Sequence, residues 1–83
     1  MDTAGRVRAI MAKALMVDPA LVRDQALLVD DLGFSSLDRY ELLMELEESL
    51  GIEVREDDLA SARTVADVIG CIEAQIKAET LRS

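Results

Sequence analysis

The 83-residue sequence contains no histidine, no tryptophan and only one cysteine. Histidine is the commonest general base near neutral pH and the commonest metal ligand, so its absence argues against both kinds of chemistry. A single cysteine excludes a disulfide within the chain and a zinc site built from cysteines. Because the chain also offers no nucleophile–base pair and little room for a pocket, we expect neither an enzyme nor a metal site.

Long apolar runs are also missing. No segment could span a bilayer and residues 1–16 lack the apolar stretch of a signal peptide, so we expect no membrane insertion and a cytoplasmic protein.

Basic residues are few, with 9 Lys and Arg against 17 Asp and Glu, which gives a formal net charge of −8. This charge repels phosphate backbones and attracts basic protein surfaces, so nucleic acid is not an expected partner.

Proline, glycine and aromatic residues are scarce, whereas 51% of the residues are apolar. This composition is typical of a folded domain, and we expect residues 1–83 to form one domain and a monomer. Phe34 and Tyr40 are the only aromatic residues, so aliphatic side chains must fill the core. Aliphatic ridges suit packed helices, and we predict an all-α fold: a small bundle of three principal helices plus one short helix.

Apolar residues recur at steps of three and four in three stretches, which predicts helices over residues 3–16, 36–50 and 65–79. A short helix is expected around residues 56–60, and residues 52–54 are the one segment where a strand is an alternative. The residues that should begin or end the principal helices are Thr3 as an N-cap, Gly51 after the second helix, and Thr64 with Asp67 as a capping box before the third.

Residues 17–35 show no sustained period, so we expect a long, ordered connection. Its apolar residues are expected to pin it to the bundle; they are Leu21, Leu27, Leu28 and Leu32. Loops of this length are usually functional or disordered.

The predicted helix 36–50 carries two apolar stripes and an acidic row. The stripe expected to face the core consists of Leu42, Leu43, Leu46 and Leu50. The opposite stripe consists of Leu37, Tyr40 and Met44, and the acidic row of Asp38, Glu41, Glu45 and Glu48. The second stripe beside four carboxylates would suit docking of a basic partner. The alternative is that neighbouring helices cover part of the stripe and that the acids are merely solvated.

Two hydroxyls, Ser35 and Ser36, stand where the chain enters this helix. A phosphate ester on such a serine would lie against free backbone N–H groups and the positive end of the helix dipole, and Gly33 would permit a close approach. Serines at helix starts are generally caps, however, and Ser35 with Asp38 three residues later fits that role. From the residues alone, modification and capping both remain open.

The run Asp31-Leu32-Gly33-Phe34-Ser35-Ser36-Leu37-Asp38, continued by the acidic helix to Glu48, resembles the signature of acyl carrier proteins. In that signature Asp-Leu-Gly precedes an Asp-Ser-Leu triplet. The resemblance implies that Ser36 receives a 4′-phosphopantetheine arm from coenzyme A through a phosphopantetheinyl transferase. It implies further that the arm carries acyl groups as thioesters, and that helix 36–50 docks acyl-loading and acyl-processing enzymes with basic surfaces.

The sequence departs from the family pattern at two positions that bear on function. Ser35 stands where the family usually has Asp, which favours a dedicated transferase and a specialised carrier. Arg39 places a cation near the acidic row, where its stem could lie along apolar surface with its head in water, or where it could alter the choice of partner.

The cargo stays open between the acyl groups of fatty-acid, polyketide or related biosynthesis and aminoacyl or peptidyl groups. We expect a discrete carrier rather than part of a megasynthase, and the alternative is an unmodified acidic adaptor with the carrier fold.

Two further features invite a chemical interpretation. Cys71 lies within the last predicted helix, where small buried cysteines are commonly inert, so we expect a structural role. The acidic pairs Asp30-Asp31 and Asp57-Asp58 lack the spacing and glycine of an EF-hand, so we expect solvated turn residues there, with weak binding of a divalent ion as the alternative.

Overall fold

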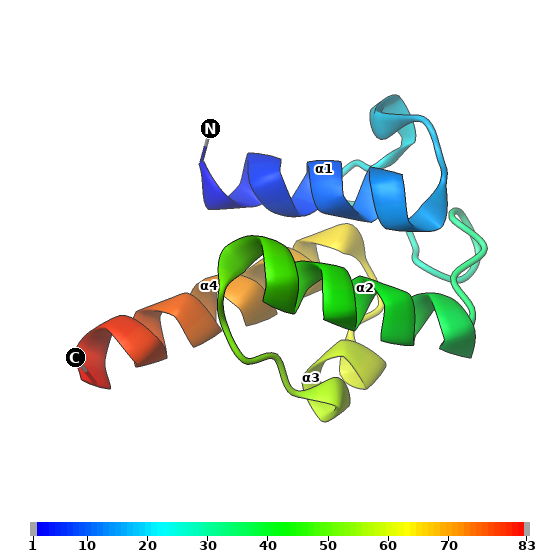
Figure 1. The fold of residues 1–83 in the computed structure, drawn as a ribbon. Helices are drawn as coiled ribbons and strands as arrows, with labels where there is room; N and C mark the ends of the chain where they lie inside the picture. Colours follow the sequence, from blue (N-terminus) through cyan, green and yellow to red (C-terminus); the bar gives the residue numbers. More distant parts are fainter. Residues whose placement is uncertain (1, 83) are drawn as a thin grey trace.

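The computed structural model describes residues 2–82, which form four α-helices and one short 3-10 helix (Figure 1). These are α1 (Thr3–Leu15), η1 (Pro19–Leu21), α2 (Ser36–Leu50), α3 (Glu56–Ser61) and α4 (Val65–Arg82). Helices α1 and α2 lie side by side and run in opposite directions; α4 lies behind α2, and short α3 lies below it in this view.

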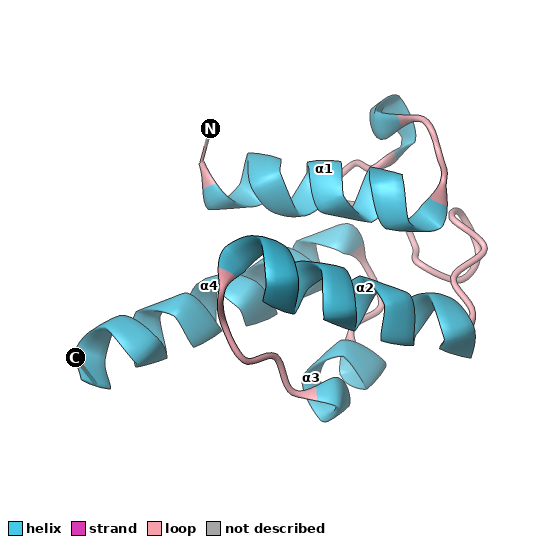
Figure 2. Ribbon diagram, viewed as in Figure 1, coloured by secondary structure: helices cyan, strands magenta, loops and turns pink. Residues whose placement is uncertain are grey.

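Figure 2 shows only helices and loops within residues 2–82. The prediction of three principal helices plus a short one is therefore confirmed. The strand alternative at residues 52–54 is wrong, because these residues form an irregular loop between α2 and α3 that pairs with no other segment. None of the helices within residues 2–82 is both long and apolar enough to cross a membrane.

The core is aliphatic, as the shortage of aromatic residues predicts. Its fully buried side chains come from every α-helix and include Val7, Met11, Leu42, Leu46, Leu59, Val65, Val68 and Ile72. The predicted inner stripe of α2 is confirmed, since Leu42 and Leu46 are buried while Leu43 and Leu50 are partly buried against the same cluster. One face of α2 is thereby used for folding, which leaves the opposite face to solvent.

Local capping bonds set where the principal helices begin. The expected N-cap at Thr3 is wrong: α1 already begins at Thr3, and the Oδ1 atom of Asp2 accepts the N–H of Gly5 at 2.7 Å. The capping box before α4 is confirmed, because Thr64 Oγ1 accepts the N–H of Asp67 at 3.1 Å and Asp67 Oδ2 accepts the N–H of Thr64 at 3.1 Å. The same carboxylate oxygen also accepts the N–H of Arg63 at 2.9 Å.

Replacing Asp67 by asparagine should destabilise the protein at neutral pH but not in acid. The backbone N–H groups of Arg63 and Thr64 hold the pKa of the Asp67 carboxyl below its usual value. Because the pKa is lower in the folded than in the unfolded chain, the carboxylate stabilises the fold above about pH 4, and this contribution is lost as the pH falls through the folded value.

Thermal unfolding measured at pH 7 and at about pH 3 should show the gap between wild type and Asp67→Asn closing in acid. Glu73→Gln, which alters an exposed carboxylate of α4, is the control and should show no such gap. An equal gap at both pH values would contradict the assignment of the stabilisation to the charge.

The connection from residue 17 to residue 35 is held by backbone hydrogen bonds within itself and is tied to the start of α4. Leu28 N–H donates to Arg63 O at 2.9 Å, and Val65 N–H donates to Ala26 O at 3.1 Å. The expectation that four leucines pin the loop is half wrong: Leu28 and Leu32 are buried but Leu21 and Leu27 are exposed. The other buried residues of the loop are Val22 and Ala26.

Candidate functional site

The two hydroxyls at the start of α2 have different surroundings. Ser35 is the N-cap: its Oγ accepts the N–H of Asp38 at 3.2 Å and donates to Asp38 Oδ2 at 3.0 Å. The same carboxylate oxygen accepts the Ser35 N–H at 2.9 Å, so the predicted capping box is confirmed. Ser36 is exposed, and its side chain makes no hydrogen bond within residues 2–82. Of the two hydroxyls, only that of Ser36 makes no hydrogen bond within the described residues.

The backbone around Ser36 suits an anion. The N–H groups of Ser36 and Leu37 make no backbone hydrogen bond within the described residues, because they belong to the first turn of α2. They lie at the positive end of the dipole of a 15-residue helix. A phosphodiester on the Ser36 Oγ would therefore find two free donors and a favourable field.

Gly33 shapes the entry to this helix through its backbone conformation. Its φ of 67° lies in the left-handed region, which residues with a Cβ rarely adopt. No heavy atom of the protein lies within 4 Å of the place a Cβ would occupy, so packing within the described residues does not require glycine here. The close approach of a phosphate ester to Gly33 stays a prediction. The turn is held by the Gly33 N–H donating to Val29 O at 3.1 Å and by the Phe34 N–H donating to Leu28 O at 2.8 Å.

The second apolar stripe of α2 is open to solvent. Leu37 is 67%, Tyr40 47% and Met44 63% exposed, so neighbouring groups cover at most about half of each side chain in this stripe. Of the acidic row, Glu41 and Glu48 are exposed, whereas Asp38 and Glu45 are partly buried. We define the docking face as these seven residues together: Leu37, Asp38, Tyr40, Glu41, Met44, Glu45 and Glu48. Its role in binding stays a prediction.

The guanidinium of Arg39 lies against protein groups rather than wholly in water, although 25% of the side chain is exposed. The guanidinium lies 5.6 Å from the centroid of the Tyr40 ring, and its Nη2 lies 3.5 Å from Oε1 of Glu56 in α3. Its Nε is buried without a hydrogen-bond partner within the described residues. The distance to Tyr40 is within cation–π range. Arg39 therefore links α2 to α3 and is not part of the exposed acidic row.

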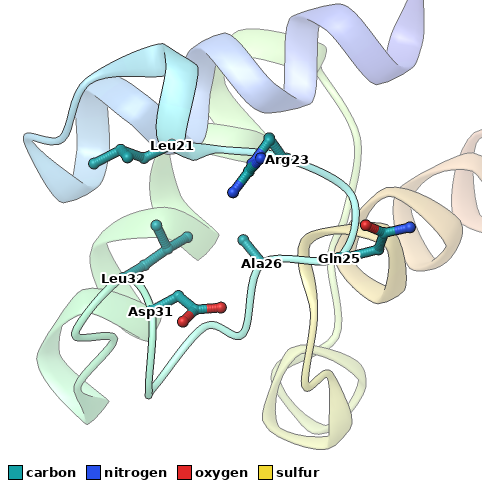
Figure 3. Close-up of a pocket in the computed structure, with 6 residues that line it drawn as sticks. All are labelled: Leu21, Arg23, Gln25, Ala26, Asp31 and Leu32. Atoms are coloured by element: carbon teal, nitrogen blue, oxygen red, sulfur yellow. The ribbon is translucent and has the colours of Figure 1, made fainter.

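Two hollows lie near α2. The first, of about 310 Å³, is formed by the connection before α2, and Figure 3 shows Arg23 and Leu32 pointing into it from opposite sides. Its lining contains neither Ser36 nor any residue of the docking face; it consists of Leu21, Arg23, Gln25, Ala26, Asp31 and Leu32. The attachment candidate is thus an exposed helix start rather than a pocket.

The second hollow, also of about 310 Å³, joins the docking face to the end of α1, where Met16 is one of its lining residues. The sequence pattern missed this residue. Periodicity reveals which residues share a helix face, but it cannot show that the end of one helix lies against the middle of another.

The remaining candidates show no chemical role. Burial is the main cause that raises the pKa of the Cys71 thiol, which disfavours the reactive thiolate, and Cys71 Sγ lies 3.7 Å from the carbonyl oxygen of Asp58. Asp31 caps a turn by accepting the N–H of Leu27 at 2.7 Å. Within residues 2–82, no group of three or more acidic or cysteine side chains is arranged to hold a metal ion.

Comparison with known proteins assigns a family to this arrangement. The family described as "Phosphopantetheine attachment site" matches residues 5–72. An acyl carrier protein of Solidesulfovibrio magneticus is 42% identical over 73 residues, which cover 88% of this chain and 94% of the relative. An acyl carrier protein of Thermotoga maritima is 38% identical over 71 residues, which cover 86% and 88%.

Among solved structures, a Mycobacterium tuberculosis protein assigned to the acyl carrier proteins superposes with a TM-score of 0.76 at 32% identity. The match covers 88% of this chain and 97% of that one.

Proposed function

Because this chain belongs to the acyl carrier protein family, whose phosphopantetheine attachment domain carries a covalent 4′-phosphopantetheine, we propose that Ser36 holds that arm. Proteins of this family are carriers rather than catalysts, and the terminal thiol of the arm binds acyl groups as thioesters. One observation carries the assignment to Ser36: its hydroxyl is exposed and free, while the Ser35 hydroxyl is engaged with Asp38.

The residues around Ser36 define what the chain contributes to attachment. The Ser36 Oγ forms a bond to phosphorus while the pyrophosphate bond of coenzyme A breaks and adenosine 3′,5′-bisphosphate leaves. No described side chain makes a hydrogen bond to this hydroxyl and the sequence has no histidine, so the proton must pass to a base from outside this chain. The free N–H groups of Ser36 and Leu37 then stabilise the phosphodiester anion.

The docking face is the part of this chain that we assign to partner recognition. Acyl carrier proteins interact with phosphopantetheinyl transferases and with acyl-processing enzymes in general. Here Leu37, Tyr40 and Met44 provide apolar contact area, and the carboxylates beside them attract basic surfaces and orient the partner. The net charge of −8 favours the same class of partner.

The chain acts, in this proposal, as one monomeric carrier domain over residues 1–83 in the cytoplasm. It presents acyl intermediates to enzymes of fatty-acid, polyketide or related biosynthesis. A specialised carrier is favoured by the residue directly before Ser36, which is Ser35 rather than Asp, so that no carboxylate stands at this position. A transferase that modifies this chain must therefore recognise other features of α2.

The test is an intact-mass measurement on protein co-expressed with a broad-specificity phosphopantetheinyl transferase. We expect the addition of one phosphopantetheine, located on Ser36 by peptide mapping. Protein that remains unmodified with several such transferases would overturn the proposal and favour an acidic adaptor with the carrier fold. The mass of the protein isolated with its acyl group would identify the cargo.

A further inference from the structure

Arg39 lies in α2 one turn after Ser36, the proposed attachment residue. Residues three apart on a helix are neighbours on its surface, with Cβ atoms about 5–6 Å apart, a gap that an arginine side chain can span. Long helical side chains also lean towards the N-terminus of their helix, which is the direction from Arg39 to Ser36. A phosphodiester on the Ser36 Oγ would therefore lie within reach of the Arg39 guanidinium.

The contacts of Arg39 within the protein leave most of its hydrogen-bonding capacity unused. A guanidinium has five N–H donors in a planar fork. The charged partner of Arg39 is Glu56, and the 3.5 Å between Nη2 and Oε1 is long for a hydrogen bond between charged groups. Nε is buried without a hydrogen-bond partner among residues 2–82, and such a donor lowers the stability of the fold. The pair with Glu56 therefore explains little of why an arginine stands here.

The charge of Arg39 is also poorly placed in the unmodified chain. The start of a helix is the positive end of its dipole, which disfavours cations and favours anions. Asp38 is the acidic residue of the first turn of α2, but its Oδ2 atom accepts hydrogen bonds from the N–H and hydroxyl of Ser35. An anion on Ser36 would give the Arg39 guanidinium an opposite charge at this end of the helix.

We propose that the Arg39 guanidinium binds the phosphodiester of the arm once Ser36 is modified, an inference that rests on the proposed function. The guanidinium lies over the ring of Tyr40, which also follows Ser36 by one turn. Rotation of the side chain brings its planar fork onto the two non-bridging oxygens of the phosphodiester, where arginine can donate two parallel hydrogen bonds. The weak contact with Glu56 is given up. Arg39 thereby holds the base of the arm against α2 and limits the directions in which the rest of the arm extends.

The unpaired Nε–H group of Arg39 allows a direct test in the wild-type protein. The ¹H–¹⁵N signals of the arginine side chains are compared before and after the arm is attached from coenzyme A, and intact mass verifies one arm per chain. The Nε–H signal of Arg39, identified by its loss in Arg39→Lys, should shift on attachment. Arg8, whose guanidinium is paired with Asp24, is the internal control and should not respond.

Stability provides a second readout that does not depend on carrier activity. Attachment of the arm should raise the melting temperature of the wild type by about 3 °C, because a new charge pair forms. The rise should be absent in Arg39→Gln and partial in Arg39→Lys, which keeps the charge but not the planar fork. Lys77→Gln removes a cation from an exposed position on α4 and should retain the full rise.

An Arg39 Nε–H signal that does not move when the arm is attached would overturn this inference, and so would an equal rise in melting temperature in the wild type and Arg39→Gln. In both cases the added mass on Ser36 would still support the proposed function. A wild-type chain that never accepts an arm would overturn the proposed function, and this inference with it.

Discussion

Ser36→Ala should abolish attachment of phosphopantetheine completely. The side chain of Ser36 supplies the only oxygen at this position that is free to bond phosphorus, because the neighbouring Ser35 hydroxyl accepts and donates within the capping box. Intact mass after incubation with coenzyme A and a transferase should show full conversion of the wild type and none of the variant. The variant should fold normally, since the exposed Ser36 side chain makes no hydrogen bond within residues 2–82.

Ser35→Ala is the matched control, because it removes a hydroxyl one residue away. This variant should still accept one arm, but its free energy of unfolding should fall by about 1 kcal/mol through loss of the N-cap. Opposite results, with Ser35→Ala unmodified and Ser36→Ala modified, would move the attachment site to Ser35. Modification of both variants would show that neither hydroxyl alone is required, which would contradict the assignment to Ser36.

The second large effect is expected from reversing charge on the docking face. Glu41→Lys combined with Glu45→Lys should lower kcat/KM for modification by about a hundredfold at low salt, because like charges brought together at an interface cost several kcal/mol. The loss should shrink at about 0.5 M salt, where the Debye length is only a few ångströms. Steady-state kinetics of attachment at both salt concentrations would measure this difference.

Glu73→Lys on α4 is the control for net charge. It makes the same change in charge as either single substitution, at an exposed position outside the docking face, so its effect on kcat/KM should be small. If Glu73→Lys impaired attachment as strongly as Glu41→Lys alone, steering by overall charge rather than docking on α2 would explain the loss. Circular dichroism of each variant would verify that the helices are retained.

The bounds of α2 could be predicted from the sequence because the signals that set them are local. The Ser35–Asp38 capping box, the apolar residues at helical spacing and Gly51 in the left-handed conformation all act within a few residues of the helix. The capping box before α4 was predicted for the same reason. The N-cap of α1 was misplaced by one residue, since Asp2 and Thr3 are both good caps and only the structure shows which side chain bonds.

The burial of the long connection was predicted only in part, because contacts with residues far along the chain decide it. Backbone bonds to the segment before α4 set its path, and that path buries Val22 and Ala26 while leaving Leu21 and Leu27 exposed. Hydrophobicity alone cannot reveal which residues of the connection are buried, since the exposed residues are as apolar as the buried ones.

The sequence by itself determined the fold class, the family, the acidic character and the expected place of the arm. Helical periodicity, helix capping and the run around Ser36 each depend only on residues that are close together in the sequence. Only the tertiary structure decided which residues far apart in the sequence lie next to one another. It showed that Arg39 reaches Glu56 of α3 and that Met16 borders the same hollow as Met44. The physical reason is that packing α1 and α3 against α2 joins residues that no local pattern relates.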